Sequence, residues 1–248
     1  MKALITGASS GIGWDMAQIL SDKGYDIIAV ARRQKRLEEL KNTLETNVEI
    51  VCCDLTDTEE CKSLVRYAHD VDILINNAGF GVFGDLSSTD LDSELKMIDT
   101  NAKAVHILTK LFADIFYKKN KGYILNVASI ASFLPGPLLS TYYSTKSYVR
   151  ILSESIYGEF KSKKSDVYIG VLCPGPVATE FDKVANVKFS LKSSTPEFIA
   201  EYALKKMFSK KLIILPTLSV KLAVIFQRFV PKKLLISLVH KMQKKKLS

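Results

Sequence analysis

Tyr142 and Lys146 are the residues whose types and spacing most directly suggest chemistry. They are four positions apart, so on a helix they share one face. A lysine ammonium beside a phenol favours the phenolate and would lower the pKa of the Tyr142 hydroxyl from about 10. A phenol that titrates nearer neutrality is a better proton donor and acceptor. The same spacing also occurs on ordinary surface helices, but the adjacent Tyr143 has Ser147 at the matching position, so the pattern selects Tyr142.

Ser129 lies thirteen residues before Tyr142 and directly after an apolar run that ends at Val127. A hydroxyl at this place could hold a substrate carbonyl oxygen beside the phenol. Ser129, Tyr142 and Lys146 would then form a site for proton transfer to a carbonyl or from an alcohol.

A second feature is the glycine spacing G-x-x-x-G-x-G of Gly7, Gly11 and Gly13, which follows the first apolar run. Glycine lets the chain turn tightly and lets backbone N–H groups approach a pyrophosphate. A helix that begins here would add unpaired N–H donors and a favourable dipole. An ordinary strand–helix turn is the alternative, but the position after the first strand favours a dinucleotide site.

Arg32 and Arg33 follow the second apolar run, where an NAD-binding fold carries an acidic residue for the ribose hydroxyls. A guanidinium pairs well with phosphate, so the two arginines favour the 2′-phosphate of NADP(H) over NAD. The alternative is a solvated helix start, since Lys35 and Arg36 follow closely.

Short apolar runs alternate with segments of helical periodicity, and this order predicts the elements that must hold these residues. The predicted strands are 3–6, 26–31, 49–53, 73–76, 123–127 and 168–173, with a further one at 212–215. The predicted helices are 12–23, 33–45, 57–69, 90–118, 142–164 and 196–209. Such alternation predicts an α/β fold, a doubly wound parallel sheet with helices on both faces.

Over roughly residues 1–215, the sequence resembles the short-chain dehydrogenase/reductase superfamily. The matching motifs occur in the family's order, at 6–13, Asp54 and Leu55, 76–79, Asn101, Ser129, Tyr142, Lys146 and 174–179. The resemblance implies a Rossmann-type domain over 1–215. The charge and the apolar pattern of the remaining residues predict a basic, apolar, helical extension over 216–248.

The resemblance also implies a role for each catalytic position. Tyr142 would be the acid in carbonyl reduction and the base in alcohol oxidation, and Ser129 would orient the substrate oxygen. Lys146 would lower the pKa of Tyr142 and hold the nicotinamide ribose. Asn101 would hold a water that connects Lys146 to a proton relay. No metal ligand set is expected, because the sequence shows no cluster of cysteine and histidine residues.

The cofactor would be NADP(H), with Asp54 touching the adenine and with Thr179 and the Val177 backbone fixing the carboxamide. The cofactor-binding residues expected on this basis are Gly7, Ser9, Ser10, Gly11, Ile12, Gly13, Arg32, Arg33, Asp54, Leu55, Asn77, Ala78, Gly79, Tyr142, Lys146, Pro174, Gly175, Val177 and Thr179. Substrate contacts are expected from Phe80, Phe83 and the apolar segment 133–139, and a lid from 180–194.

The net charge of +9 is concentrated at one end of the chain. Residues 202–248 contain twelve basic and no acidic residues, which leaves the remainder with a net charge of −3. Charge alone is weak support for nucleic-acid binding, and no recognition motif accompanies it, so no nucleic-acid partner is expected. Four cysteines without disulfide or dithiol spacing, and a first strand that begins at once, predict a cytoplasmic protein without a signal peptide.

The extension leaves two interpretations open. The segment 217–230 is apolar but contains Lys221 and Arg228, so it is a poor membrane span. One interpretation is a helix that forms a dimer contact or supports the lid. The other is part of a basic amphipathic segment that lies on an anionic membrane. For 217–230 the helix that forms a dimer contact or supports the lid is favoured. After Pro231, one helix face is expected to carry the large apolar residues Leu234, Leu235, Leu238, Val239 and Met242.

The sequence therefore predicts an NADP(H)-dependent oxidoreductase that interconverts a carbonyl and an alcohol on a lipophilic or acyl-type small molecule. A homodimer or homotetramer is expected from the resemblance. The alternative is a non-catalytic, NADP-responsive binding or scaffold protein at a membrane surface. The basic extension is the feature that supports this alternative.

Overall fold

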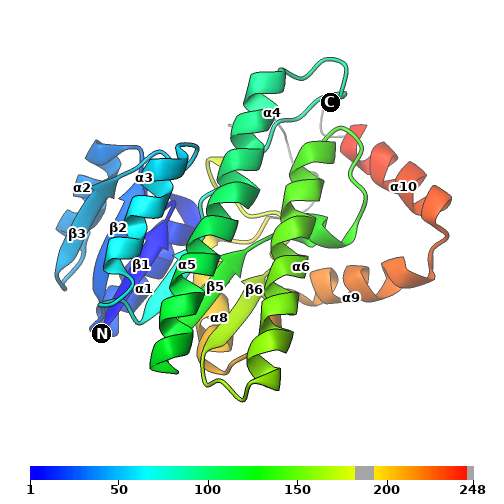
Figure 1. Ribbon diagram of the computed structural model, residues 1–248. Coiled ribbons are helices and arrows are strands. Elements are labelled where there is room, and N and C mark those ends of the chain that lie inside the picture. The colour runs from blue at the N-terminus through cyan, green and yellow to red at the C-terminus, as the bar shows by residue number, and fades with distance from the viewer. Residues whose placement is uncertain (182–192, 245–248) are drawn as a thin grey trace.

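The computed structural model describes residues 1–181 and 193–244, and its centre is one parallel sheet (Figure 1). The described strands are β1 (Lys2–Thr6), β2 (Asp26–Ala31), β3 (Val48–Cys52), β4 (Ile73–Asn76), β5 (Tyr123–Val127), β6 (Tyr168–Leu172) and β7 (Ile213–Ile214). They pair in the order β3-β2-β1-β4-β5-β6-β7, all parallel. The predicted doubly wound α/β fold is confirmed.

Helices cover both faces because successive strand residues point to opposite sides of the sheet. Ala3 and Ile5 of β1 pack into the core under α1 (Gly11–Asp22), α2 (Gln34–Thr43) and α8 (Pro196–Phe208). Leu4, between them, packs into the core under α3 (Thr58–Ser63), α5 (Ala104–Lys119) and α6 (Ser140–Ser162). Strands buried on both faces need continuous apolar runs, which is the pattern seen in the sequence.

The strand order reverses between β1 and β4, and this switch point opens a crevice beyond the carboxyl ends of the strands. Six of the motifs each follow the end of a different strand, so parallel pairing brings them to this edge, whereas Asn101, Tyr142 and Lys146 are placed there by helices. The residues gathered by strand pairing are Gly7 after β1, Arg32 after β2, Asp54 after β3, Asn77 after β4, Ser129 after β5 and Pro174 after β6.

Most predicted elements begin and end within two residues of the observed ones, but two predicted helices are interrupted and one strand is shifted. The helix predicted over 90–118 is α4 (Leu91–Ile98) and α5 joined by a π-helical turn, Asp99–Lys103. The helix predicted over 57–69 is α3 followed by a 3₁₀ turn, Leu64–Tyr67. The strand predicted over 49–53 begins and ends one residue earlier, because it pairs with β2 from Val48 to Cys52.

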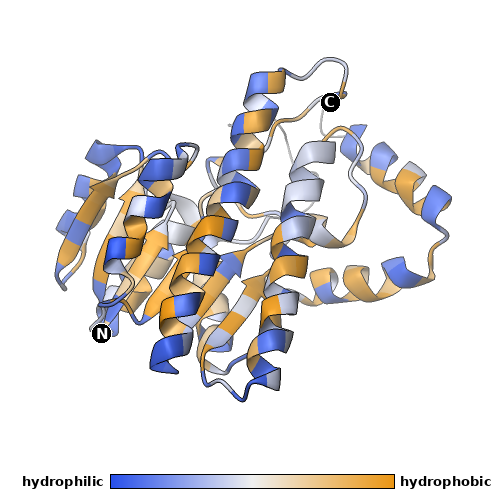
Figure 2. Cartoon of the chain, viewed as in Figure 1, coloured by the Kyte–Doolittle hydropathy of each residue, from blue (hydrophilic) through white to orange (hydrophobic). Residues whose placement is uncertain are grey.

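The extension forms two helices, α9 (Leu218–Phe226) and α10 (Lys232–Lys244), beside the β6 and β7 side of the sheet (Figure 1). Thr217 caps α9 by accepting the N–H of Val220 at 3.3 Å. Figure 2 shows α9 as mostly hydrophobic and α10 as alternating between hydrophobic and hydrophilic residues. Among the described helices, none combines the length and the hydropathy that crossing a membrane requires.

Candidate active site

The loop between β1 and α1 leaves no room for a side chain at its glycine positions. Gly7 and Gly11 have φ of +67° and +56°, a region that favours glycine. A Cβ on Gly7 would lie 2.8 Å from Ala78 Cα, and one on Gly13 would lie 2.5 Å from the Gly7 carbonyl oxygen. The glycines therefore place no side chain over the backbone at the start of α1, and its N–H groups suit a pyrophosphate.

Thr6 and Asn77 hold this loop against the end of β4. The Thr6 hydroxyl oxygen accepts the N–H groups of Asn77 and Ala78 at 3.0 and 3.2 Å. In return, the Asn77 amide donates to the carbonyl oxygens of Thr6 and Gly7 at 3.1 and 3.2 Å. These bonds fix the floor of the crevice, and Asn77 and Ala78 line the pocket above it.

At the adenosine end, the Arg33 guanidinium lies on the glycine loop. It donates to the Ser9 hydroxyl at 3.1 Å and pairs with the Glu180 carboxylate at 2.8 Å. Both charged side chains are nearly half exposed, so a bound phosphate could displace the carboxylate at little cost. The Arg33 hydrogen bond holds the pKa of Glu180 below its usual range.

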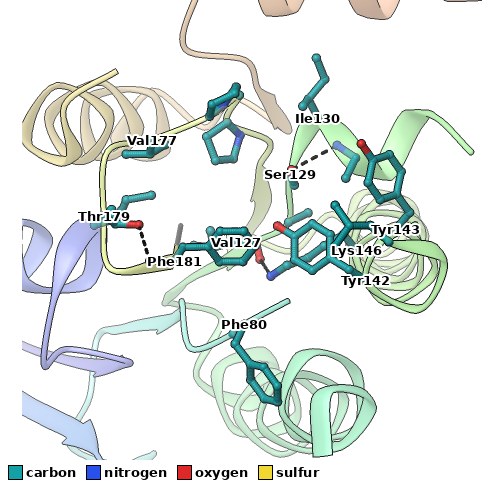
Figure 3. Close-up of a pocket in the computed structure, with 18 of the residues that line it drawn as sticks. Phe80, Val127, Ser129, Ile130, Tyr142, Tyr143, Lys146, Val177, Thr179 and Phe181 are labelled. Carbon is teal, nitrogen blue, oxygen red and sulfur yellow. Dashed lines mark hydrogen bonds between the residues drawn. The ribbon is translucent and has the colours of Figure 1, made fainter. Parts of the chain in front are cut away.

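Tyr142, Lys146 and Ser129 meet at the inner end of the crevice (Figure 3). Tyr142 and Lys146 come from consecutive turns of α6, with the Lys146 nitrogen 5.8 Å from the centre of the Tyr142 ring. Lys146 is buried and donates to the Val127 carbonyl oxygen at 2.9 Å. The Ser129 hydroxyl, just beyond β5, accepts the Ala131 N–H at 3.1 Å.

The pKa values of this pair are controlled by burial. Burial raises the pKa of Tyr142 above its usual value, and a hydrogen bond with Ser129 opposes that shift. Burial lowers the pKa of Lys146 to about 8. In the protein without cofactor, burial thus outweighs the lowering expected from Lys146, and the pKa of Tyr142 lies above its usual value. The physical reason is that the low-dielectric pocket penalises the phenolate more than its neighbours stabilise it.

Asn101 lies behind the pocket rather than in its lining. It sits in the π-helical turn, fully buried, and its amide donates to the Phe80 carbonyl oxygen at 2.8 Å. A Cβ on Gly79 would meet the Asn101 amide oxygen at 2.9 Å and the Lys146 nitrogen at 3.1 Å. Gly79 thus allows Asn101 to approach Lys146, which is where a bridging water would be needed.

The segment after β6 closes the crevice over the glycine loop. A Cβ on Gly11 would lie 2.9 Å from Thr179 Cγ2, so the two segments are in direct contact. Phe181 donates its N–H to the Thr179 hydroxyl at 3.2 Å, and its ring centre lies 5.4 Å from that of Tyr142 (Figure 3). Figure 3 shows Thr179 and Val177 on the opposite side of the pocket from Tyr142, with Phe181 between them.

One cavity of about 1130 Å³ joins these parts. Its lining contains all the residues expected for cofactor and catalysis except Gly13, which lies beneath the loop, and Asn101. Arg32, Asp54 and Leu55 follow β2 and β3 on one side of the switch point, whereas Ser129 follows β5 on the other side, and all of them line the cavity together with Tyr142. The bare glycine loop, the two arginines and the facing Thr179 together fit a dinucleotide with a nicotinamide ring.

Comparison with known proteins identifies the family. A sequence model described as short chain dehydrogenase matches residues 1–188. The NADP-dependent 3-hydroxy acid dehydrogenase of Schizosaccharomyces pombe is 36% identical over 223 residues, covering 81% of this chain and 84% of that protein. The very-long-chain 3-oxoacyl-CoA reductase of Rattus norvegicus is 30% identical over 213 residues, covering 82% and 67%.

The chain belongs to the short-chain dehydrogenase/reductase family. A solved short-chain dehydrogenase from Sphingobium yanoikuyae in complex with NADPH has the same fold, with a TM-score of 0.83 at 27% identity over 92% of both chains. This short-chain dehydrogenase is thus an oxidoreductase that uses a nicotinamide cofactor.

The structure of this short-chain dehydrogenase adds site residues that motif reasoning did not find. Gln243 of α10 is buried, and its amide donates to the Tyr143 hydroxyl at 2.5 Å. Its other amide atom, Oε1, is buried without a partner among the described residues. Phe226 of α9 and Val239 of α10 also line the cavity. A local sequence motif could not have predicted the contact between Gln243 and Tyr143, because the two residues are 100 positions apart.

Part of the substrate expectation is wrong. Phe80, Leu134 and Leu139 line the cavity as expected, but Phe83 does not. Phe133 packs away from it, with the Arg150 guanidinium 4.5 Å from its ring centre. The expected lid 180–194 lies mostly outside the described residues, which resume at 193.

Proposed function

We propose that the protein is an NADP(H)-dependent oxidoreductase that reduces a lipophilic or acyl-type carbonyl compound, or oxidises the matching alcohol. The observation that carries this proposal is the meeting of Ser129, Tyr142 and Lys146 at the inner end of a cavity with an apolar outer wall. The relatives are named as oxidoreductases, which favours catalysis over the non-catalytic binding role that the sequence left open.

The chain's own residues supply proton transfer and orientation. The nicotinamide cofactor, when bound, supplies or accepts the hydride. In reduction, the Tyr142 hydroxyl donates its proton to the substrate oxygen, while Ser129 donates a hydrogen bond to that oxygen and fixes its place. The Lys146 ammonium stabilises the phenolate that remains after the transfer. In oxidation, the same phenolate accepts the proton.

Arg32 and Arg33 support a preference for NADP(H). Both line the cavity, and the Arg33 guanidinium already holds an anion, the Glu180 carboxylate, at 2.8 Å. A 2′-phosphate would offer more acceptor oxygens to the same guanidinium than a single carboxylate does. One relative is named as NADP-dependent, and one solved neighbour is bound to NADPH, which supports the same choice.

The class of substrate is proposed from the cavity wall. Val220, Leu235 and Val239 of the extension line it, together with Leu134 and Leu139. Side chains of this kind favour an apolar chain over a charged or sugar-like substrate. The names of two relatives, a 3-hydroxy acid dehydrogenase and a 3-oxoacyl-CoA reductase, favour an acyl-type carbonyl.

Steady-state oxidation of NADPH and of NADH against a panel of aldehydes, ketones and 3-oxoacyl thioesters tests the proposal. The Tyr142→Phe variant should lose about 10²–10⁴-fold in kcat/KM, the usual contribution of a positioned acid. Equal turnover by Tyr142→Phe and the wild type would show that the assigned acid is wrong.

The arginines are tested in the same assay by Arg32→Asp and Arg33→Asp. Charge-assisted hydrogen bonds are worth about 1.5–3 kcal/mol, so each variant should lower the NADPH-to-NADH ratio of kcat/KM by about 10–100-fold. Lys35→Asp is the matched control, because Lys35 is exposed on α2 outside the cavity lining. A ratio that changes equally in all three variants would contradict a specific phosphate site.

We also propose a cytoplasmic homo-oligomer, as a dimer or tetramer. All four cysteines are free thiols, which suits a reducing compartment. The outer face of α6 carries Tyr148 and Ile151, which are 43% and 53% exposed and favour contact with a second copy. The domain boundary near residue 215 is part of the same proposal, with 216–248 as an extension that completes the substrate pocket.

A further inference from the structure

The two helices of the extension expose an unusual amount of apolar surface. Leu218, Leu222, Ile225, Phe226 and Phe229 lie at intervals that place them on one side of α9 and the turn after it. Leu218 is 70% exposed and Phe229 is 80% exposed. The opposite side of α9, through Val220 and Val224, is buried against the protein. α9 is therefore apolar on both sides, although only one side is covered.

On α10 the large apolar residues divide between two stripes. Leu235 and Val239 are buried, whereas Leu234, Leu238 and Met242 are about half exposed. The five residues lie on one broad side of α10, but only Leu235 and Val239, together with Gln243, are buried. We call the exposed apolar residues of α9 and α10, with the basic residues between them, the α9–α10 surface.

The entrance of the cavity lies within this surface. Phe226, Leu238 and Met242 line the cavity and are also 62%, 46% and 53% exposed. An apolar compound that rests on the α9–α10 surface would therefore reach the cavity without crossing a polar rim at these positions.

Basic side chains accompany the apolar ones. Arg228, Lys232, Lys233, Lys241 and Lys244 are exposed on or between the two helices. No acidic residue occurs anywhere from 202 to 248, whereas the rest of the chain has a net charge of −3. The α9–α10 surface therefore attracts an anionic partner.

Two kinds of partner would cover the exposed apolar residues, and charge separates them. In a two-fold contact with a second copy, the same basic groups would face one another, which is unfavourable. An anionic lipid surface offers both an apolar interior and negative charge. Helices of nine and thirteen residues are too short to span a bilayer, but they can lie in its interface.

We propose that the α9–α10 surface docks on an anionic lipid membrane, from which lipophilic carbonyl compounds enter the catalytic cavity. Docking on the membrane does not depend on the oxidoreductase activity proposed above. The entry of lipophilic carbonyl compounds into the cavity does rest on that activity.

Docking is tested by co-sedimentation of the full chain with vesicles of phosphatidylcholine alone or mixed with phosphatidylserine. The wild type should sediment with the mixed vesicles, and less so at high salt. Lys232→Glu/Lys233→Glu and Leu218→Ser/Phe229→Ser should each weaken binding by at least about tenfold. Lys23→Glu/Lys163→Glu and Leu86→Ser are matched controls, since these residues are exposed elsewhere.

Entry is tested with a long-chain ketone held in the vesicles and with a water-soluble ketone. The surface variants should lose at least about tenfold in rate on the vesicle-held ketone and keep the wild-type rate on the soluble one. No turnover of either ketone by the wild type would count against the proposed reductase activity but not against docking.

Three results would overturn the docking proposal. One is failure of the wild type to sediment with the mixed vesicles. Another is equal sedimentation of surface variants and controls. The third is that the wild type is an oligomer without vesicle binding and that Leu218→Ser/Phe229→Ser is a monomer. The α9–α10 surface would then be an interface between copies.

Discussion

At the scale of single residues, the site depends on side chains whose charged forms are destabilised by burial. Lys146 is 4% exposed, and burial lowers its pKa to about 8, so its charged form is held against a desolvation penalty. Its hydrogen bond to the Val127 carbonyl oxygen is the contact that ties it to β5. Tyr142 is shifted in the opposite direction, towards the neutral phenol. The cofactor-free site therefore holds its proton on Tyr142, ready for reduction.

These shifts predict the pH dependence of carbonyl reduction. Tyr142 keeps its proton through neutral pH because its pKa is raised, whereas Lys146 is charged below about pH 8 and neutral above it. Loss of the ammonium removes the cation that stabilises the phenolate. We expect kcat/KM for NADPH, which reports groups of the free enzyme, to be level from pH 6 to about 8 and to fall above that.

Initial rates at saturating carbonyl compound, in buffers of constant ionic strength, would measure this profile. The thermal midpoint recorded at each pH separates catalysis from unfolding. A fall centred below pH 7, or a level profile to pH 10, would contradict the assignment of Lys146.

At the scale of elements, the helix that carries the catalytic pair also anchors the extension. Tyr142 points into the crevice, while the next residue, Tyr143, accepts the hydrogen bond from Gln243 of α10. Burial raises the pKa of Tyr143 to about 12, so its hydroxyl stays protonated. α10 thus sits over the substrate end of the cavity through one polar contact and two buried apolar residues, Leu235 and Val239.

Gln243→Leu is expected to loosen α10 without touching the proton donor. An unpaired buried hydroxyl on Tyr143 should lower the free energy of unfolding by about 1–3 kcal/mol. KM for a lipophilic ketone should rise while kcat changes little, because Gln243 contacts Tyr143 rather than Tyr142. Thermal melts and steady-state kinetics measure the two effects.

Lys241→Ala is the control on the same helix, since Lys241 is exposed. A loss in kcat with an unchanged KM would show that Gln243 acts on the chemical step instead of on the wall of the cavity.

At the scale of the whole molecule, charge and apolar surface divide the protein into two parts. The sheet and its helices, residues 1–215, hold the nicotinamide site and are nearly neutral, with 27 basic and 26 acidic residues, whereas the extension has eight basic and no acidic residues. The outer face of α6 and the α9–α10 surface are different exposed apolar regions, one from the sheet layer and one from the extension. A second copy on α6 would leave the α9–α10 surface free for lipid.

Light scattering after size exclusion tests the contact through α6. The wild type should have a mass that is a multiple of 27.7 kDa, and Ile151→Asp should be a monomer, because a buried unpaired charge opposes association. Leu86→Asp, at a residue that is 75% exposed in the loop before α4, should behave as the wild type. A monomeric wild type, or an unchanged mass for Ile151→Asp, would rule out this interface.

The sequence by itself determined the parallel α/β fold and the set of residues at the crevice. Strands buried on both faces have continuous apolar sequences, and most of the motifs directly follow such a run, so parallel pairing must gather them at one edge. The local sequence was enough to predict where Gly7, Ser129, Tyr142 and Lys146 lie. Gly7 and Ser129 follow strand ends, and Tyr142 and Lys146 are one helical turn apart.

Only the tertiary structure decided what closes the cavity and how the site titrates. The bond between Gln243 and Tyr143 joins residues 100 positions apart, and the pair of Arg33 and Glu180 joins the ends of two different strands. The pKa of Tyr142 depends on how much water its pocket excludes, which the spacing to Lys146 does not report. Burial and long-range contacts are properties of packing in three dimensions, and no local pattern in the chain contains them.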